Sequence, residues 1–301
     1  MNNAGHTKTP KVQNNLSSRW VTFIWERYNP LLNLSFSVLF FLAHYYSSEK
    51  TESIPYLKVL LLLVGVSIFL FKLRLFDEIK DYEYDSVAYP TRPLPRGAIF
   101  HNDIYRGIAL LTFFEYLIFS AFGTATLFAI FIADTYSLLM FKEFFARKWI
   151  RPKLILYAIT HTFVVGLLSL AIFSALTAKP IWELNYSAYV FSAISWLLFN
   201  VYEFGRKSFI SEEENIKADS YSKNYGRPIA SFLVTINIVA VILLANTILS
   251  SMTFLYILTC IFFTLSILFA VFNRKPFGKL FRVGSFLFIF TFYLIVIIAH
   301  L

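Results

Sequence analysis

Of the 301 residues in this chain, 57% are hydrophobic and only 15% are charged, whereas soluble domains carry about 25% charged residues. This composition cannot supply the polar surface that a soluble fold of this length needs, and a single cysteine excludes a disulfide framework. The net charge of +9 would suit nucleic-acid binding in a soluble protein, but repeated apolar runs of bilayer-spanning length indicate a membrane protein with no nucleic-acid partner.

Residues 1–29 are predicted to form a cytoplasmic tail that ends in an interfacial helix. Trp20, Phe23 and Trp25 lie close together just before Pro30, and aromatic side chains of this kind favour the boundary between lipid and water. The remainder of the chain, residues 30–301, is predicted to be a single transmembrane domain.

Nine apolar segments follow, each of a length that crosses a bilayer as a helix. The third and fourth are separated only by Gly123, and we divide them there because one helix over both would be too long for a single span. The predicted fold is therefore an all-α integral membrane bundle of nine transmembrane helices. They are expected at residues 31–47, 57–76, 104–122, 124–141, 154–176, 187–204, 229–250, 252–272 and 280–300.

The basic residues indicate the orientation, because loops rich in Lys and Arg stay in the cytoplasm. With nine spans, all of the 27 Lys and Arg residues except Lys50, Lys58 and Lys179 fall on the side of the N-terminus, Lys72 among them. We therefore expect a cytoplasmic N-terminus and an outside C-terminus, in the bacterial cytoplasmic membrane.

The first of two long cytoplasmic loops begins with a row of carboxylates. Asp77, Asp81 and Asp85 recur every four residues, with Glu78 beside the first, so a helical continuation of the second span would place them on one face. Like charges at this spacing repel, and Mg²⁺ would stabilise them because it binds carboxylate and phosphate oxygens. The alternative is a solvated acidic helix end that Lys80 and nearby arginines offset.

Two arginines follow in a proline-rich turn. Arg92 and Arg96 lie within the stretch 89–97, where prolines restrict the backbone. Guanidinium groups held rigidly beside metal-loaded carboxylates suit a diphosphate.

The second long loop again mixes both signs of charge, and it should lie on the same face, over the same cavity. Glu203 ends an apolar span, where a carboxylate is costly and usually functional. Arg206, Lys207 and Asp219 follow it. We interpret the two loops as two half-sites for metal and phosphate.

Other acidic residues fall outside these half-sites. The run Glu212–Glu214 is expected to be solvated charge. Glu115 and Asp134 lie within predicted spans, where an ionisable group is a functional candidate, and we expect them to contribute to a pocket for an acceptor molecule.

The order of these features resembles the UbiA superfamily of membrane prenyltransferases over nearly the whole chain. The most specific element is the Arg-Pro-Leu-Pro stretch that begins at Arg92. The family's first motif, Asn-Asp-x-x-Asp-x-x-x-Asp, is matched with changes that keep oxygen ligands, at Asp77, Glu78, Asp81 and Asp85.

Two other motifs of the family are altered, which is typical of a divergent subgroup. Glu203 takes the first acidic position of the second motif, but Arg206 and Lys207 lie where another carboxylate is common. The family's Tyr-x-x-x-Lys motif survives only as Leu138-x-x-x-Lys142.

The resemblance implies a UbiA-type helical bundle with a central cavity capped by the cytoplasmic loops. It implies an enzyme, a prenyltransferase that moves a prenyl group from an isoprenyl diphosphate to a lipophilic acceptor at the cytoplasmic face, among membrane lipid. Two Mg²⁺ ions, one under each acidic loop, would be the cofactors, with ligands drawn from Asp77, Glu78, Asp81, Asp85, Glu203 and Asp219. The residues expected to bind diphosphate are Arg92, Arg96, Lys142, Arg206 and Lys207, and those expected to act in catalysis are Asp81, Asp85 and Arg92.

Two other functions remain open at this point. The altered second motif is compatible with a non-catalytic carrier or transporter that binds an amphipathic molecule in the same cavity. A polyprenyl-phosphate sugar-phosphate transferase would use similar loops.

Overall fold

The computed structural model describes residues 15–49, 54–214, 219–249 and 251–300. Lys50 and the first fourteen residues of the predicted tail lie outside this range. Within it, nine helices have 18 residues or more: α2 (Pro30–Ser47), α3 (Tyr56–Lys80), α5 (His101–Ser120), α6 (Thr124–Phe141), α8 (Leu154–Thr177), α9 (Tyr186–Arg206), α11 (Arg227–Ala245), α12 (Thr253–Val271) and α13 (Lys275–Ala299). The shorter α-helices are α1 (Leu16–Phe23), α4 (Tyr82–Ala88), α7 (Arg147–Ile150) and α10 (Tyr221–Tyr225).

Each long helix covers one predicted span, with ends that differ by no more than five residues. The division at Gly123 is confirmed: α5 ends before it, α6 begins after it, and its φ of 100° is a conformation that favours glycine. Six of the nine helices (α3, α6, α8, α11, α12 and α13) are long and apolar enough to cross a membrane. The chain is thus an all-α, multi-pass membrane protein, and the count of nine spans stays a prediction.

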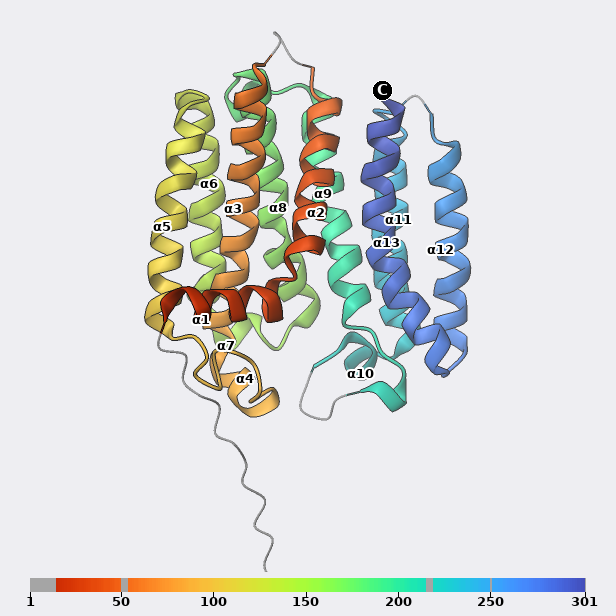
Figure 1. Cartoon of the computed structure of the whole chain (residues 1–301). Coiled ribbons are helices and arrows are strands. Elements are labelled where there is room, and N and C mark those ends of the chain that lie inside the picture. The colour runs from red at the N-terminus through yellow and green to blue at the C-terminus, as the bar shows by residue number, and fades with distance from the viewer. Residues whose placement is uncertain (1–14, 50–53, 215–218, 250, 301) are drawn as a thin grey trace, which may run out of the picture.

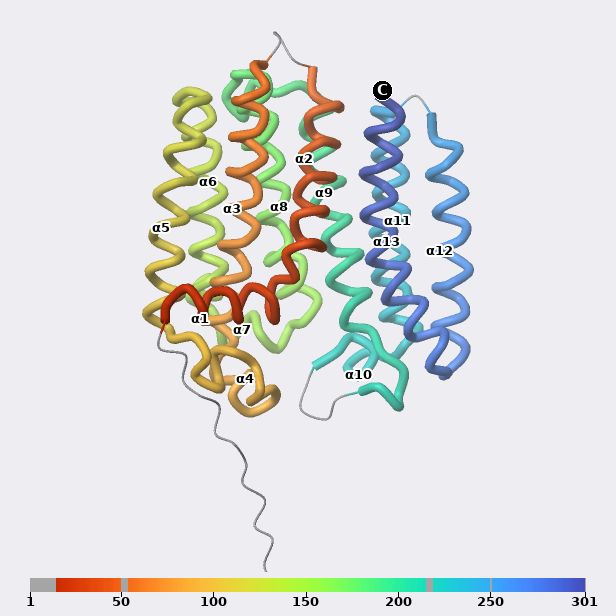
Figure 2. Tube along the Cα trace, in the orientation of Figure 1, coloured from red at the N-terminus to blue at the C-terminus, as the bar shows by residue number. Residues whose placement is uncertain are grey.

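The long helices stand side by side in one bundle (Figures 1 and 2). The start of α1 lies at the same end of the bundle as α4, α7 and α10, whereas the C-terminus lies at the opposite end (Figure 1). The start of α1 and the end of α13 thus lie at opposite ends of the bundle, as an odd number of crossings between them requires. The orientation relative to the cytoplasm stays a prediction.

Helix α1 lies across the bundle rather than along it (Figure 1), as an interfacial helix does. Its Trp20 ring packs on Gly107 of α5, where an added Cβ would come within 2.6 Å of the ring. Its Arg19 makes an ion pair with Asp103 of α5 at 2.9 Å. At the following corner, Asn29 accepts a hydrogen bond from the backbone N–H of Leu32 and so caps α2.

A buried ionic cluster joins α3, α5 and α6. Lys72 donates to the carboxylates of Glu115 and Asp134, the second at 2.5 Å, and all three side chains are almost fully buried. The structure therefore corrects two expectations. Lys72 is not a residue of the cytoplasmic loop, and Glu115 and Asp134 do not line the cavity described below. The lysine charge offsets one carboxylate, and the cluster is neutral when the other carboxyl holds a proton, which suits the inside of the bundle because an unpaired charge there is costly.

Removing the lysine alone should destabilise the protein. In Lys72→Met, Glu115 and Asp134 would remain buried without a counter-charge, and breaking one partner out of a buried ion pair typically costs about 3–5 kcal/mol. We expect a clear drop in the thermal unfolding midpoint, measured in detergent by loss of the monodisperse chromatographic peak.

The combined variant Lys72→Met, Glu115→Met and Asp134→Leu should recover much of that loss, because it removes the whole cluster. Lys58→Met, an exposed site on the same helix, is the matched control. Equal unfolding midpoints for Lys72→Met and Lys58→Met would contradict a structural role for the cluster.

Candidate functional site: a charged cavity at one end of the bundle

A cavity of about 850 Å³ lies at the end of the bundle that holds α4 and α10. The C-terminal ends of α3 and α9 form opposite parts of its wall, and the first turns of α8 contribute a third part. The two long loops follow α3 and α9, so the expectation that they converge over one cavity is confirmed.

Charges of both signs line this cavity in nearly equal number. The acidic lining residues are Asp77, Glu78, Asp81, Asp85, Glu203, Glu213, Glu214 and Asp219. The basic ones are Arg27, Arg74, Lys80, Arg92, Arg151, Arg206 and Lys207. An ionic lining of this kind suits a polyanionic ligand together with a cation.

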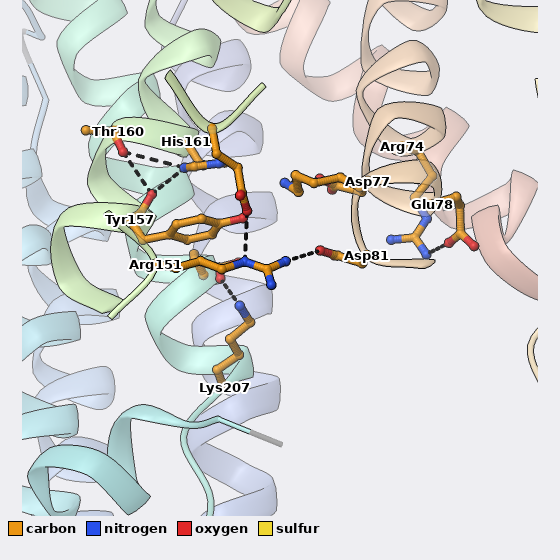
Figure 3. A network of polar contacts seen from close by, with 12 residues as sticks. Arg74, Asp77, Glu78, Asp81, Arg151, Tyr157, Thr160, His161 and Lys207 are labelled. Atoms are coloured by element: carbon orange, nitrogen blue, oxygen red, sulfur yellow. Dashed lines mark hydrogen bonds and ion pairs between the residues drawn. The ribbon is translucent and has the colours of Figure 1, made fainter. Parts of the chain in front are cut away.

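Asp77 and Asp81 are the carboxylates of the first motif that remain open to the cavity. Their side chains are 42% and 40% exposed, and they point toward Arg151 and Lys207 on the opposite wall (Figure 3). Asp77 pairs with Lys80 at 2.8 Å, but the nearest cation to Asp81 is the Arg151 guanidinium at 3.7 Å. Removal from water, with the nearby charges of Asp77 and Asp85, raises the pKa of the Asp81 carboxyl.

Glu78 is held differently, because arginines bind it on the side away from the cavity centre. Arg27 and Arg74 both contact its Oε1, the former at 2.7 Å. Glu78 points away from Asp77 and Asp81 (Figure 3), and its buried Oε2 has no hydrogen-bond partner among the described residues.

Asp85 is also closed off by an arginine. The side chain of Asp85 is 4% exposed and accepts a hydrogen bond from Arg92 at 2.5 Å. Arg92 in turn stacks over the Tyr89 ring, with its guanidinium carbon 3.9 Å from the ring centroid. The row of carboxylates predicted as one stripe is thus divided at Asp81, where α3 ends and α4 begins.

This donor set fits one divalent cation at Asp77 and Asp81. Within the described part of the chain, no three Asp, Glu, His or Cys side chains converge closely enough to enclose a metal ion. Mg²⁺ does not need such a cage, since it commonly binds one or two carboxylates and completes its shell with water and substrate phosphate. Two half-exposed carboxylates facing a cavity meet that requirement.

On the opposite wall, the end of α9 carries two basic side chains and one carboxylate. Glu203, near the end of α9, pairs with Arg206 at 2.5 Å and with Lys207 at 2.8 Å. Both basic side chains remain partly exposed to the cavity, at 45% and 33%. Asp219 lies at the cavity as an exposed residue. The assignment of Glu203 and Asp219 as metal ligands stays a prediction.

Two residues expected to bind diphosphate do not line the cavity. Arg96 makes a two-pronged ion pair with Glu26, at 2.6 and 2.8 Å. Lys142 is exposed at the end of α6, with its ammonium 5.0 Å from the centre of the Phe141 ring. This geometry gives their predicted role no support.

Two basic lining residues carried no recognisable signal in the sequence. Arg27 comes from the segment after α1, and Arg151 follows α7, so both reach the cavity only through the tertiary fold.

His161 also lines the cavity. It stacks on Tyr157 with ring centroids 3.8 Å apart, and its Nδ1 lies 2.7 Å from the Tyr157 carbonyl oxygen (Figure 3). Because a carbonyl can only accept, Nδ1 carries the proton and Nε2 of the neutral ring bears a lone pair.

The expectation that Glu212–Glu214 are merely solvated is wrong for two of the three residues. Glu213 makes a two-pronged ion pair with Arg282 of α13, at 2.7 and 2.8 Å. Glu214 accepts hydrogen bonds from Ser220 and Ser222. These contacts hold the second loop over the cavity, and the hydrogen bond from Arg282 lowers the pKa of the Glu213 carboxyl.

Glu213→Gln should loosen this loop. The variant replaces an ion pair by a neutral contact, so we expect faster amide hydrogen exchange over residues 208–214, measured by mass spectrometry at pH 7. Glu212→Gln is the control, because Glu212 is 64% exposed and its ion pair, at 3.3 Å, is with the exposed Lys275.

The same measurement has a defined pH dependence. Because the folded-state pKa of Glu213 is lowered, the ion pair stabilises the loop above the ordinary pKa of a glutamate and is lost as the pH falls through the lowered value. After correction for intrinsic exchange, protection of the wild-type loop should hold from pH 7 to pH 5. Equal exchange in the wild type and Glu213→Gln at pH 7 would show that the pair does not hold the loop.

Comparison with known proteins supports the fold. No protein-family model and no curated protein matches the sequence. Among solved structures, the chain is similar to a digeranylgeranylglyceryl phosphate synthase, with 19% identity, a TM-score of 0.63, and coverage of 94% of this chain and 98% of that one. It is also similar to a UbiA homolog from Aeropyrum pernix K1, with 15% identity, a TM-score of 0.63, and coverage of 87% and 97%. The resemblance to the UbiA superfamily is therefore confirmed at the level of the fold: the chain folds as a UbiA-type membrane bundle.

Proposed function

We propose that this chain is a prenyltransferase that moves a prenyl group from an isoprenyl diphosphate to a lipophilic acceptor. The observation that carries the proposal is the meeting of Asp77 and Asp81 with Arg151, Arg206 and Lys207 around one cavity at the end of an apolar bundle. Prenyl diphosphates have a polyanionic head and a hydrocarbon tail, and this arrangement offers a site for each. The fold shared with the two solved structures supports the same conclusion.

The basic wall would hold the diphosphate and stabilise the charge that develops on it. Arginine donates two parallel hydrogen bonds to phosphate oxygens, and lysine adds a mobile point charge. Mg²⁺ bound by Asp77 and Asp81 would supply further positive charge to the leaving diphosphate. As the allylic C–O bond breaks, its electron pair leaves with the diphosphate, so these charges stabilise the transition state more than the ground state.

The allylic carbon would become positively charged and must be shielded from water. Tyr157, Tyr221 and Phe209 line the cavity, and the faces of aromatic rings stabilise a cation. The acceptor then forms the new bond to carbon and loses a proton. The unprotonated Nε2 of His161 lies in the same wall and would receive it.

We further propose that the cavity opens to the cytoplasm. The basis is the distribution of Lys and Arg along the chain. In a prenyl diphosphate, the head group is polar and the hydrocarbon tail is not, so the molecule is expected at the membrane surface. The cavity end of the bundle would then meet the donor at the membrane surface.

Asp81→Asn tests the proposed site. Asparagine keeps the shape but offers one neutral oxygen in place of an anionic ligand, so we expect a rate loss of about 100- to 1,000-fold. Turnover would be measured as Mg²⁺-dependent diphosphate release from geranylgeranyl or farnesyl diphosphate with a panel of lipophilic acceptors. Glu83→Gln, an exposed change two residues away, should retain wild-type turnover.

Other outcomes of this assay separate the alternatives. Binding of prenyl diphosphates without release, across the whole acceptor panel, would favour a carrier. Release that requires a polyprenyl phosphate and a nucleotide sugar would favour a sugar-phosphate transferase. Wild-type turnover in Asp81→Asn would show that the acidic row is not part of the catalytic site.

The orientation is tested by fusing reporters to the chain. A reporter after Leu301 should report from outside, and one inserted near residue 90 or residue 212 should report from the cytoplasm, because the two cavity loops lie on the side of the basic residues. Reporters at 90 and 301 on the same side would overturn the odd number of spans.

A further inference from the structure

The end of α3 and the end of α9 present different charged groups to the cavity. Asp77 and Asp81 project from the end of α3, and Arg151 and Lys207 face them from the other side (Figure 3). Lys80 offsets one of the two negative charges on the α3 wall. At the end of α9, two cations share a single carboxylate, which leaves this helix end positive. In the loop after α9, Glu213 pairs with Arg282 and Glu214 accepts hydrogen bonds from two serines.

Glu203 forms its ion pairs with residues that follow it closely in the sequence. Arg206 and Lys207 follow Glu203 by three and four residues, so both fall on the same helical face one turn away. The positive charges of Arg206 and Lys207 are covalently fixed beside Glu203, so they would repel a divalent cation that approached its carboxylate. Glu203 is also only 14% exposed, which leaves little of its carboxylate free to bind a metal ion.

The basic side chains on this wall keep donors available. Arg206 and Lys207 are 45% and 33% exposed, and Arg151 is 35% exposed. Arg151 contacts Glu143 at 2.9 Å through Nε, and its Nη2 turns toward Asp81. Partly exposed guanidinium and ammonium groups around one cavity form an anion site that needs no metal ion.

We propose that this site takes one divalent cation, at Asp77 and Asp81, and that Arg206 and Lys207, assisted by Arg151, bind the second phosphate group directly in place of another cation. The inference rests on the proposed function, because it assumes a diphosphate ligand. It differs from the two-metal arrangement that the family resemblance implies. The second half-site is the reason for the difference: Arg206 and Lys207 already hold the Glu203 carboxylate, so Asp219 would have to bind a second cation without it.

The first experiment counts metal ions. The full chain in detergent is equilibrated with Mn²⁺ and labelled inorganic pyrophosphate, excess ligand is removed by rapid gel filtration, and both are quantified on the protein. We expect one protein-bound Mn²⁺ for each bound pyrophosphate. A ratio of two would overturn the inference and leave the proposed function standing, whereas no pyrophosphate binding at any Mn²⁺ concentration would overturn both.

The second experiment removes the metal. Pyrophosphate should still bind in the presence of EDTA, because the α9 wall acts without a cation. Arg206→Gln and Lys207→Gln should each weaken this metal-free binding by about ten- to hundredfold, the value of a charge-assisted hydrogen bond. Lys275→Gln, a change at a lysine that is 67% exposed and outside the cavity, should not.

Asp81→Asn gives the contrasting result in the same assay. It should abolish the Mn²⁺-dependent gain in pyrophosphate affinity and leave metal-free binding at least as strong as in the wild type, since it removes a negative charge. Metal-free binding that Arg206→Gln and Lys207→Gln do not change would overturn the inference without any measurement of turnover.

Discussion

The cost of an unpaired charge in an apolar bundle governs where this protein can place its chemistry. A charged group transferred from water to hydrocarbon without a partner is heavily destabilised. Inside the bundle the chain meets this constraint by closing Lys72 between two carboxylates. At the cavity, where water reaches the side chains, it can leave Asp77 and Asp81 open. The position of the site at the end of the bundle follows from this difference.

The same constraint ties the membrane surface to the site. Among the described residues, the segment before α2 contributes four ion pairs: Arg19 with Asp103, Glu26 with Arg96, and Arg27 with both Glu78 and Asp85. The last of these places a side chain from the interfacial region in the cavity lining. Arg96 therefore has a structural partner, Glu26, in place of the predicted ligand, and this pair fixes the proline-rich turn against the segment Ile24–Tyr28 that follows α1.

The helices and the cavity could be predicted from the sequence, but the ion pairs between distant residues could not. Spans are readable because hydrophobicity persists over about twenty residues, and the side of each loop then follows from the parity of the spans. Arg27 and Glu78 are 51 residues apart, and Glu213 and Arg282 are 69 apart, so no local pattern connects them. Lys72 was misplaced for a related reason. A lysine near the end of an apolar run is equally compatible with a loop and with a buried ion pair, and only the neighbouring helices decide between them.

The altered second motif is compatible with a site that still binds diphosphate. A diphosphate that carries one divalent cation is unsymmetrical, because the cation shields some of its oxygens and leaves others as bare anions. A cavity with carboxylates on one wall and Arg206 and Lys207 on the other matches that asymmetry. It would also set the direction of the ligand, since the metal-bearing end must lie toward α3. Under the proposed function, the hydrocarbon tail would enter the apolar bundle, and the bond to be broken would lie at the boundary between the ionic cavity and the membrane interior.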